Sequence, residues 1–378
     1  MMQAPATKNG SGNGSGSGSG SRGGHEVGPG AGPGFVVVRA TRASRIGGAA
    51  ALVLVAVLFT FPFWADAGWM RELDEMACTL IFAMMWNLLA GYGGMVSIGQ
   101  QAFFGLGGYA LVMLGNLGGV NPFVAVPVAA FATAAVALPV SQLAFRLQGG
   151  YFAIGTWVIA EVFRLSIANS SAVGGGSGTS LTALRGIEKA TRVRVTFWLC
   201  LASAVAAVAL VYGVLRSRQG LALLAIRDSE VASESQGVNV RATKLAVYLV
   251  AAFGAGLAGA LYFLGNLRIS PDAAFTVNWS AFSIFIVMIG GIGTIEGPIV
   301  GVVSFYLLNK AFSDYGSAYL IGLGLLAIVV TVVFPKGLWG WCSKRFDLHF
   351  FPVQRRLVLT ELATSPRTAA RSPDAQPE

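Results

Sequence analysis

The sequence contains long stretches without a single charged residue, and these limit the possible folds strongly. No Asp, Glu, Lys or Arg lies between Glu75 and Arg146, which leaves room for about three membrane crossings at roughly 20 residues each. Three shorter gaps follow at 245–267, 273–295 and 315–335. Only 11% of the residues are charged, against roughly 25% in soluble domains. The sequence therefore predicts an all-α protein that crosses a membrane many times.

Ten apolar segments account for most of the chain. They cover residues 46–65, 76–90, 101–117, 122–145, 151–168, 195–215, 245–267, 279–292, 297–312 and 319–334. Several are too short to cross the hydrocarbon core alone at about 1.5 Å per residue. We therefore expect a transmembrane helical bundle of about eight to ten spans, including discontinuous or re-entrant segments.

Composition divides the chain into three regions. Residues 1–45 are rich in Gly and Ser and end in basic residues, and we expect them to form a disordered cytoplasmic head. Residues 46–341 hold the apolar segments and form the membrane domain. Residues 342–378 mix Pro, Ser, Arg and acidic residues, which indicates a solvated cytoplasmic tail.

Charges at the ends of the segments predict the orientation. Arginines precede the first segment and mainly acidic residues follow it, so the positive-inside rule places the N-terminus in the cytoplasm. An even number of crossings returns the C-terminus to the same side, in agreement with the basic residues at 336–356. The basic loop at 185–194 would lie outside and disagrees with this orientation.

The sequence offers little for catalysis, metal binding or nucleic-acid binding. The net charge of +9 lies at segment ends and in the two tails, as membrane topology requires, and predicts no nucleic-acid partner. The two histidines, His25 and His349, lie outside the apolar segments, and the three cysteines show no CxxC spacing. We therefore expect no catalytic residue, no metal site and no cofactor in this chain.

Glycine interrupts the apolar pattern at 91–99, where four glycines fall within nine residues. Broken backbone at membrane depth survives only inside protein or beside a wet cavity, and discontinuous helices are where transporters place their substrates. The predicted pathway residues here are Asn87, Gly91, Gly93, Gly94, Ser97, Gly99, Gln100 and Gln101. A turn between two closely packed helices is the alternative.

A second glycine-rich break covers 290–298, again between apolar segments. Gly290, Gly291 and Gly293 are predicted to line the same pathway. Glu296 is the only acid in this zone, and its position before Pro298 favours a role in capping the next helix.

Glu161 and Arg164 lie inside an apolar segment, three residues apart and so on one helical face. An ionisable residue inside a membrane segment is a candidate functional site. We favour instead an internal ion pair that fixes helix packing.

The most polar stretch between segments is 216–244, where charged residues interleave with apolar ones at helical spacing. A loop that only joins two spans needs far fewer residues. We predict a short amphipathic helix that docks a soluble cytoplasmic partner. Its key residues are Gly220, Ala225, Arg227, Asp228, Glu230, Ala232, Glu234 and Gly237. A helix lying in the membrane interface is the alternative, which the acidic residues disfavour.

Several motifs, in one order, resemble the LivM-like permeases, which are membrane subunits of branched-chain amino-acid ABC importers. These motifs are GYGGMVSIGQQAFFGLGGY at 91–109, GGYFAIGTW at 149–157, the polar loop at 220–239, AGALY at 258–262, SPD at 270–272, GGIGTIEGP at 290–298 and PKGL at 335–338. The resemblance spans about 46–341. It departs at Gln100, where the family usually has His, and at Ser233 and Ser235, where it usually has Ala. Gln still donates and accepts hydrogen bonds.

The resemblance implies one half of a heterodimeric pore that moves branched-chain amino acids by ATP-driven alternating access. It implies a second homologous permease subunit, two cytoplasmic ABC ATPase subunits docked on the loop at 216–244, and a periplasmic substrate-binding protein. It also implies a place in the bacterial inner membrane with both termini cytoplasmic. The chain has no Walker A motif, so ATP hydrolysis is expected in the partner ATPases and this chain is expected to be a transport subunit, not an enzyme.

Two alternatives stay open. The chain could be a permease of the same family for urea or short amides. It could also be a stand-alone secondary carrier or channel, which would need charged groups along its path, and only Glu161 and Arg164 are placed inside a span.

Overall fold

The structure is a computed structural model that describes residues 35–38, 42–312, 318–334, 336–346, 350 and 356–359. The chain forms two units, of which residues 39–354 make the larger. In the smaller unit, strand β1 (Phe35–Val38) pairs antiparallel with β4 (Arg356–Leu359). Neither strand is predicted from the sequence, in which they fall within the head and the tail.

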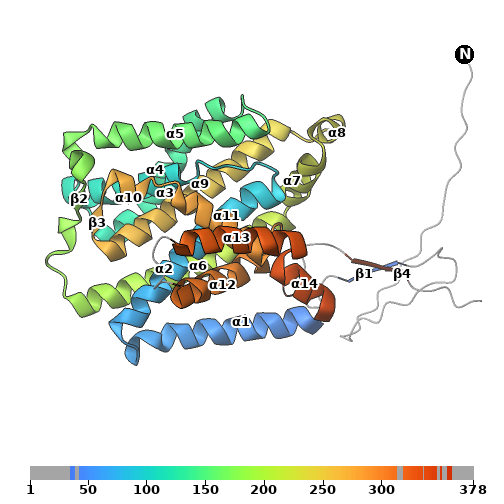
Figure 1. The fold of residues 1–378 in the computed structure, drawn as a ribbon, viewed down its shortest axis with the longest axis horizontal. Coiled ribbons are helices and arrows are strands. Elements are labelled where there is room, and N and C mark those ends of the chain that lie inside the picture. The colour runs from blue at the N-terminus through green and yellow to red at the C-terminus, as the bar shows by residue number, and fades with distance from the viewer. Residues whose placement is uncertain are drawn as a thin grey trace, which may run out of the picture. The chain divides into compact units, whose positions relative to one another are not determined.

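The larger unit is a helical bundle, and the predicted all-α membrane fold is confirmed (Figure 1). Each of the ten apolar segments coincides with a helix. These helices are α1 (Arg42–Thr60), α2 (Ala67–Asn87), α3 (Gln101–Val112), α4 (Pro122–Ala144), α5 (Gly150–Ala168), α6 (Lys189–Arg216), α9 (Val240–Asn266), α11 (Asn278–Gly290), α12 (Glu296–Phe312) and α13 (Ala318–Val333). Among the described residues, seven helical stretches are long and apolar enough to cross a membrane.

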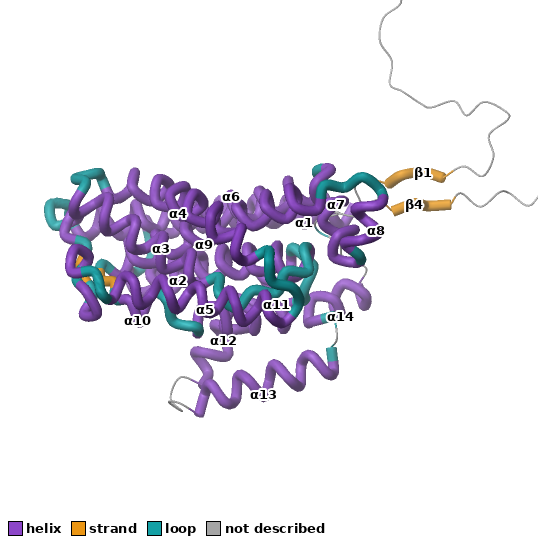
Figure 2. The backbone as a smooth tube through the Cα atoms, turned by 90° about the horizontal axis from the view of Figure 1, so that it is seen from above, coloured by secondary structure: helices purple, strands orange, loops and turns teal. Residues whose placement is uncertain are grey.

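Helices α2 and α9 form the centre of the bundle. Their most apolar windows are 67% and 72% buried inside the protein, whereas those of the other spanning helices are 50% buried or less. Helix α9 packs against α2, α3 and α4, and the view in Figure 2 shows these helices running side by side. A helix that is apolar all round is typical of such a buried position.

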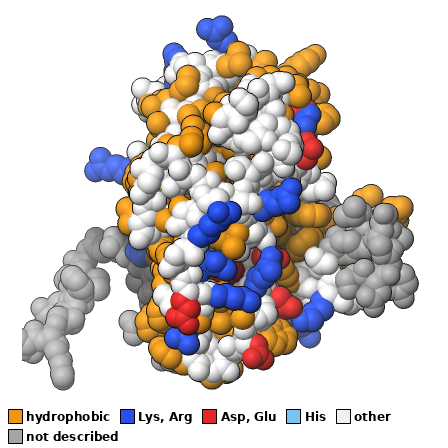
Figure 3. All heavy atoms as spheres, turned by 90° about the vertical axis from the view of Figure 1, so that its left-hand side faces the viewer, with side chains coloured by type: hydrophobic (Ala, Val, Ile, Leu, Met, Phe, Trp, Pro, Cys, Tyr) orange, Lys and Arg blue, Asp and Glu red, His pale blue; other side chains and the backbone are white. Residues whose placement is uncertain are grey.

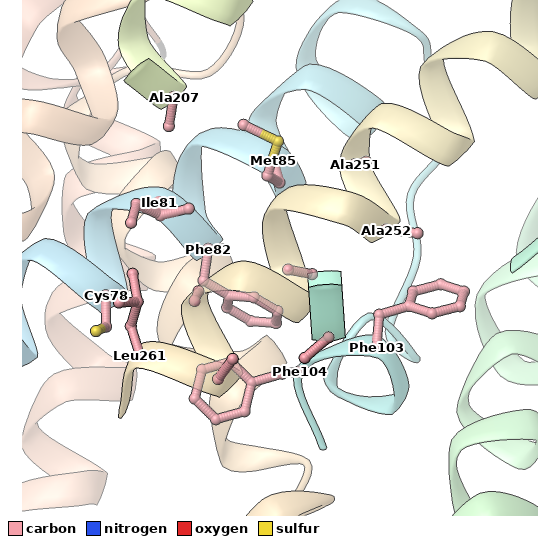
Figure 4. Packing of buried hydrophobic residues seen from close by; sticks show 14 of the residues in the cluster. Cys78, Ile81, Phe82, Met85, Phe103, Phe104, Ala207, Ala251, Ala252 and Leu261 are labelled. Carbon is pink, nitrogen blue, oxygen red and sulfur yellow. The ribbon is translucent and has the colours of Figure 1, made fainter. Parts of the chain in front are cut away.

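Small residues let α3 and α9 approach each other closely. A side chain at Gly107 would collide with the backbone of Gly256, and one at Gly259 would collide with the carbonyl of Phe104. Figure 4 shows the core beside this contact, where the rings of Phe82 and Phe104 meet edge to face with centroids 5.4 Å apart. Close helix contacts through small residues replace the hydrophobic driving force that is missing inside a membrane.

Short elements distinguish the two ends of the bundle (Figure 1). At one end lie α7 (Arg218–Asp228), α8 (Glu230–Ser235) and α14 (Gly337–Phe346), and we call this the α7 end. At the other lie α10 (Pro271–Ala274) and the paired strands β2 (Thr179–Ser180) and β3 (Arg268–Ile269), and we call this the β2–β3 end. Single helical turns complete the chain at Phe61–Phe63, Leu88–Tyr92, Met113–Leu117, Ser171–Val173, Gly175–Ser177 and Thr182–Leu184.

Candidate functional site

The first predicted helix break is present and lies partly inside the protein. Helix α2 continues beyond Asn87 as one π-helical turn, and residues 93–100 are then non-helical until α3 begins. Within this segment Ser97 is only 3% exposed, and Trp86 Nε1 donates a hydrogen bond of 2.8 Å to its carbonyl oxygen. Gly99 and Gln100 are also buried, whereas Gly94 and Val96 are exposed. The segment is therefore a helix break that is exposed near Gly94 and packed in the bundle at Gly99 and Gln100.

The second predicted break is also present, between the end of α11 and the start of α12. Gly291 and Gly293 have φ values of 131° and 73°, which favour glycine. The hydroxyl of Thr294 accepts a hydrogen bond of 3.0 Å from the backbone N–H of Gly297 and so satisfies one of the first donors of α12. Glu296 lies in the first turn of α12, in keeping with the capping interpretation.

Asn87 joins the two breaks. Its side-chain Nδ2 donates to the carbonyl of Thr294 at 2.8 Å, and its Oδ1 accepts from the backbone N–H of Gly293 at 2.9 Å. Asn87 is fully buried. Gly91 completes the contact, because a Cβ there would lie 2.7 Å from the nitrogen of Gly293.

Arg227 at the end of α7 reaches the same place. Its Nη1 donates a hydrogen bond of 2.8 Å to the carbonyl oxygen of Gly91. Its aliphatic stem packs over Gly94, where a Cβ would lie 3.2 Å from Arg227 Cγ, and Gly94 has a φ of 67°. Leu223 is fully buried beside Gly93. We call Asn87, Gly91, Arg227, Gly293 and Thr294 the break junction.

The polar loop is helical, as predicted, but it forms two helices, not one over 220–237. Ser229 separates α7 from α8 because its backbone is extended, with φ −162° and ψ 115°. Its hydroxyl accepts from the backbone N–H of Ala232 at 3.2 Å and caps α8. Gly237 ends the loop helix with a φ of 82°.

The predicted docking residues lie mostly on the surface of this helix pair. Asp228, Ala232 and Glu234 are exposed, and Glu230 is held by an ion pair with Lys244. The exceptions are Gly220, which is buried against Leu215, and Ala225, which is half-buried.

The serines at two positions where the family usually has Ala are satisfied inside α8. The hydroxyl of Ser233 donates to the carbonyl of Ser229 at 2.8 Å, and that of Ser235 donates to the carbonyl of Val231 at 2.7 Å. These hydroxyls are therefore paired, and a side-chain bond back to the carbonyl four residues earlier slightly destabilises a helix.

The two predicted pathway glutamines lie apart from the break junction. Gln101 is fully buried, and its Oε1 accepts from the hydroxyl of Ser280 on α11. Gln100 is 1% exposed, and neither of its side-chain polar atoms has a hydrogen-bond partner in the described part of the chain. Gly99 fits directly against the backbone of Thr156 on α5. The predicted pathway residues thus fall into two groups.

Glu161 and Arg164 form the expected ion pair, and the structure adds a third member. Arg164 Nε donates to Glu161 Oε1 at 2.9 Å, and Arg164 Nη1 donates to Asp272 Oδ1 at 2.6 Å. Asp272 belongs to α10, so the arginine ties α5 to the β2–β3 end. Sequence reasoning missed this aspartate as a partner because 108 residues separate it from the arginine.

We expect Asp272→Asn to lower the free energy of unfolding by less than about 1 kcal/mol, because the side chain of Asp272 is 79% exposed and water screens the pair. Thermal denaturation of the purified chain measures this change. Glu161→Gln serves as the comparison, since that carboxylate is less exposed and accepts from both Arg164 Nε and Nη2. A larger loss from Asp272→Asn than from Glu161→Gln would contradict this account of the triad.

Comparison with known proteins identifies the family to which this chain is similar. Residues 73–334 match the family model described as branched-chain amino acid transport system / permease component. The high-affinity branched-chain amino acid transport system permease protein LivM of Escherichia coli (strain K12) is 26% identical over 317 residues, which cover 76% of this chain and 73% of that protein. LivM of Salmonella typhimurium is 25% identical over 316 residues, with the same coverage of 76% and 73%.

A third relative covers less of this chain. The probable branched-chain amino acid transport permease protein LivM of Methanocaldococcus jannaschii is 24% identical over 280 residues, which cover 65% of this chain and 80% of that protein. No solved structure matches the chain significantly. The matched region runs from α2 to the end of α13 and contains the whole break junction. The chain therefore belongs to the family of branched-chain amino acid transport system permease components.

Proposed function

We propose that this chain is the transmembrane permease subunit of an ABC importer and forms half of the path by which branched-chain amino acids cross the membrane. A second homologous permease subunit supplies the other half, two cytoplasmic ATPases supply the energy, and a periplasmic binding protein delivers the substrate. The chain lies in the bacterial inner membrane with both termini cytoplasmic. The observation that carries this proposal is the hydrogen bond from Arg227, in the polar loop, to the carbonyl of Gly91 in a broken membrane helix.

The helix pair α7–α8 is the docking element for the ATPases. Two apolar residues on it are strongly exposed, Leu221 at 63% and Val231 at 78%. The same helix pair also carries exposed charged residues, including Asp228 and Glu234. Exposed apolar side chains within a polar rim are typical of protein interfaces.

The break junction transmits movement from the docking element to the membrane helices. When the ATPases close on ATP, α7 shifts and Arg227 carries the carbonyl of Gly91 with it. Asn87 passes the shift to Gly293 and Thr294, so both breaks change together and the path opens to the other side. Broken helices suit this role, because a few backbone dihedrals at glycine absorb the rotation.

The energies are of the right size for this coupling. A hydrogen bond to a charged group contributes about 1.5–3 kcal/mol, and coupling free energies between distant sites are typically 1–3 kcal/mol. The Arg227–Gly91 contact could therefore carry most of the coupling. The contact can carry this coupling without contributing much to the stability of the fold.

Reconstitution into liposomes tests this function directly. We expect labelled leucine to be taken up only when this chain is combined with the second permease subunit, the ATPases, the binding protein and ATP. The chain alone, inserted to the same level, is the control and should give no uptake above empty liposomes. Uptake by the chain alone would make it a stand-alone carrier or channel and would overturn the proposal.

Competition in the same liposomes identifies the substrate. An excess of unlabelled isoleucine or valine should abolish leucine uptake, whereas urea and acetamide should leave it unchanged. Inhibition by urea or acetamide but not by valine would assign this permease to the transport of urea or short amides.

A further inference from the structure

A second polar site lies at the β2–β3 end, opposite the break junction. A cavity of about 340 Å³ is enclosed there by α2, α6 and the end of α9. Small-molecule sites typically have volumes of about 300–1,000 Å³. Figure 3 looks onto this end and shows Lys and Arg side chains gathered on it, with Asp and Glu side chains beside them.

The charged groups of the cavity lie at different depths along helices α2 and α6. Helices α2 and α6 both begin at this end, so residue numbers rise with depth. Lys189 and Arg192 lie on α6 near the mouth, and Thr196 lies four residues, or about 6 Å, below Arg192. Asp74 lines the cavity from α2, one turn below its first cation, Arg71. Positive groups therefore lie toward the mouth and a carboxylate lies below them.

The polar groups of the cavity differ in whether the protein satisfies them. Arg71 is engaged, since its Nη2 donates to Asn266 Oδ1 at 2.9 Å and its Nε lies 3.9 Å from Glu75 Oε1. In contrast, Asp74 Oδ1 and Thr196 Oγ1 are buried and have no hydrogen-bond partner among the described residues. Thr196 is only 3% exposed.

These unsatisfied atoms indicate a ligand. Burying a polar atom without a partner costs free energy, and a carboxylate inside a membrane protein usually faces a solute path. The cations at the mouth are equally available, because neither Lys189 nor Arg192 forms an ion pair within the described part of the chain. The cavity thus offers hydrogen-bond acceptors at depth and cations above them.

We propose that this cavity binds the zwitterion of an α-amino acid. The ammonium group donates to Asp74 Oδ1 and Thr196 Oγ1, and the carboxylate faces the mouth and accepts from the guanidinium of Arg192. The apolar side chain of the ligand packs against Val193 and Leu267, which also line the cavity and are half-buried. The choice of an amino acid over other zwitterions rests on the proposed function.

The position of the charges favours a dissolved solute over an aminolipid. They gather where the helices end (Figure 3), whereas the flanks of the bundle carry exposed apolar side chains such as Leu165 on α5 and Leu307 on α12. A lipid headgroup would enter from such a flank. The cavity is thus an amino-acid site at the end remote from α7, separate from the junction that responds to the ATPases.

Calorimetric titration of the full chain in nanodiscs with L-leucine tests this site. We expect the unmodified chain to bind leucine, and Asp74→Asn and Thr196→Val to bind it about tenfold more weakly or worse. Asp66→Asn is the matched control, because Asp66 is an exposed carboxylate just before α2 that does not line the cavity. It should leave the affinity unchanged.

Ligand analogues test the orientation. Leucinol, which has the ammonium but no carboxylate, should be weakened by Asp74→Asn but not by Arg192→Gln. L-Leucine should be weakened by both. Asp74→Asn keeps the volume of the side chain, whereas Arg192→Gln shortens it, and thermal denaturation of each variant shows whether it is folded. If Asp74→Asn does not fold, the leucine affinity of Thr196→Val tests the site in its place.

Three results would overturn the proposal: no leucine binding to the unmodified chain, unchanged binding in folded Asp74→Asn and Thr196→Val, or an equal response to sodium chloride or phosphoethanolamine in place of leucine. The last would make the cavity a cation site or a lipid headgroup site.

Uptake by the assembled transporter distinguishes a failure of this proposed site from a failure of the proposed transport function. If the assembled transporter takes up leucine but leucine does not bind in this cavity, the proposed site is wrong and the proposed function stands. If leucine binds in the cavity but there is no ATP-dependent uptake, the proposed function is wrong and the proposed site stands.

Discussion

Replacing Asn87 by Leu is expected to abolish uptake by the assembled transporter and to lower the thermal stability of the chain. The leucine is similar in volume but leaves the N–H of Gly293 and the carbonyl of Thr294 without their partner. Each unsatisfied group costs about 1–3 kcal/mol when it is buried. Both groups are half-buried here, so we expect a loss near the lower end of this range for each. Thermal denaturation and liposome uptake measure the two effects.

Asn116→Leu is the matched control. Asn116 Nδ2 donates to the carbonyl of Ser180, and its Oδ1 accepts from the N–H of Thr182 and Ala183. It therefore ties loops together as Asn87 does, but at the β2–β3 end. This control should also lower stability while leaving the number of leucine molecules imported per ATP hydrolysed unchanged. If both asparagine variants change that ratio equally, Asn87 acts only through stability.

Arg227→Ala is expected to separate ATP hydrolysis from uptake. The ATPases should still bind and hydrolyse ATP, but leucine uptake per ATP should fall about tenfold or more, because a coupling free energy of 1–3 kcal/mol corresponds to about 5–150-fold. The stability of the chain should change by less than about 1 kcal/mol, since the side chain of Arg227 is 40% exposed and water replaces part of the lost contact. Glu230→Gln should act in the same direction, because it breaks the pair with Lys244 that holds α8.

Arg218→Ala supplies the control for Arg227. Both arginines lie on α7 and both are exposed, but only Arg227 reaches the break junction. The control should keep normal uptake per ATP. Normal coupling in Arg227→Ala, or equal uncoupling in Arg218→Ala, would show that the hydrogen bond to Gly91 transmits nothing.

The sequence alone was sufficient to predict the helices and the two breaks. Charge-free stretches set the apolar segments, because a charged side chain inside a membrane is costly. Clustered glycines marked the breaks, because a glycine such as Gly293 allows a backbone conformation that other residues rarely adopt. Both signals are local in the chain, and both are confirmed.

Contacts between distant segments could not be predicted in this way. Asn87 and Gly293 are separated by 206 positions, and nothing near either residue indicates the other. The same holds for Asp272 beside Arg164. The division of the polar loop at Ser229 depends on one extended residue, whereas the helical spacing of the apolar residues continues across it. The strands β1 and β4 also pair across nearly the whole length of the chain.

The buried glutamines show a further limit. Residues near a glycine-rich break were predicted to line one pathway, yet Gln100 and Gln101 are buried, and Gln101 bonds to Ser280 on α11 and not to the break junction. An extended segment rises about twice as far per residue as a helix does, so a few non-helical residues carry the chain well into the bundle. Their place on a pathway remains a prediction.

Cross-linking between α8 and the ATPase tests the central proposal most directly. A single cysteine is introduced as Val231→Cys, which lies at an exposed position, in a chain that carries Cys342→Ser and retains the buried Cys78 and Cys200. We expect this variant to cross-link to the ATPase in the assembled transporter, with a yield that changes on addition of ATP. Ala190→Cys, exposed at the β2–β3 end, should give no such product. Absence of the product from Val231→Cys, or equal yields from both positions, would contradict the assignment of α7–α8 as the docking element.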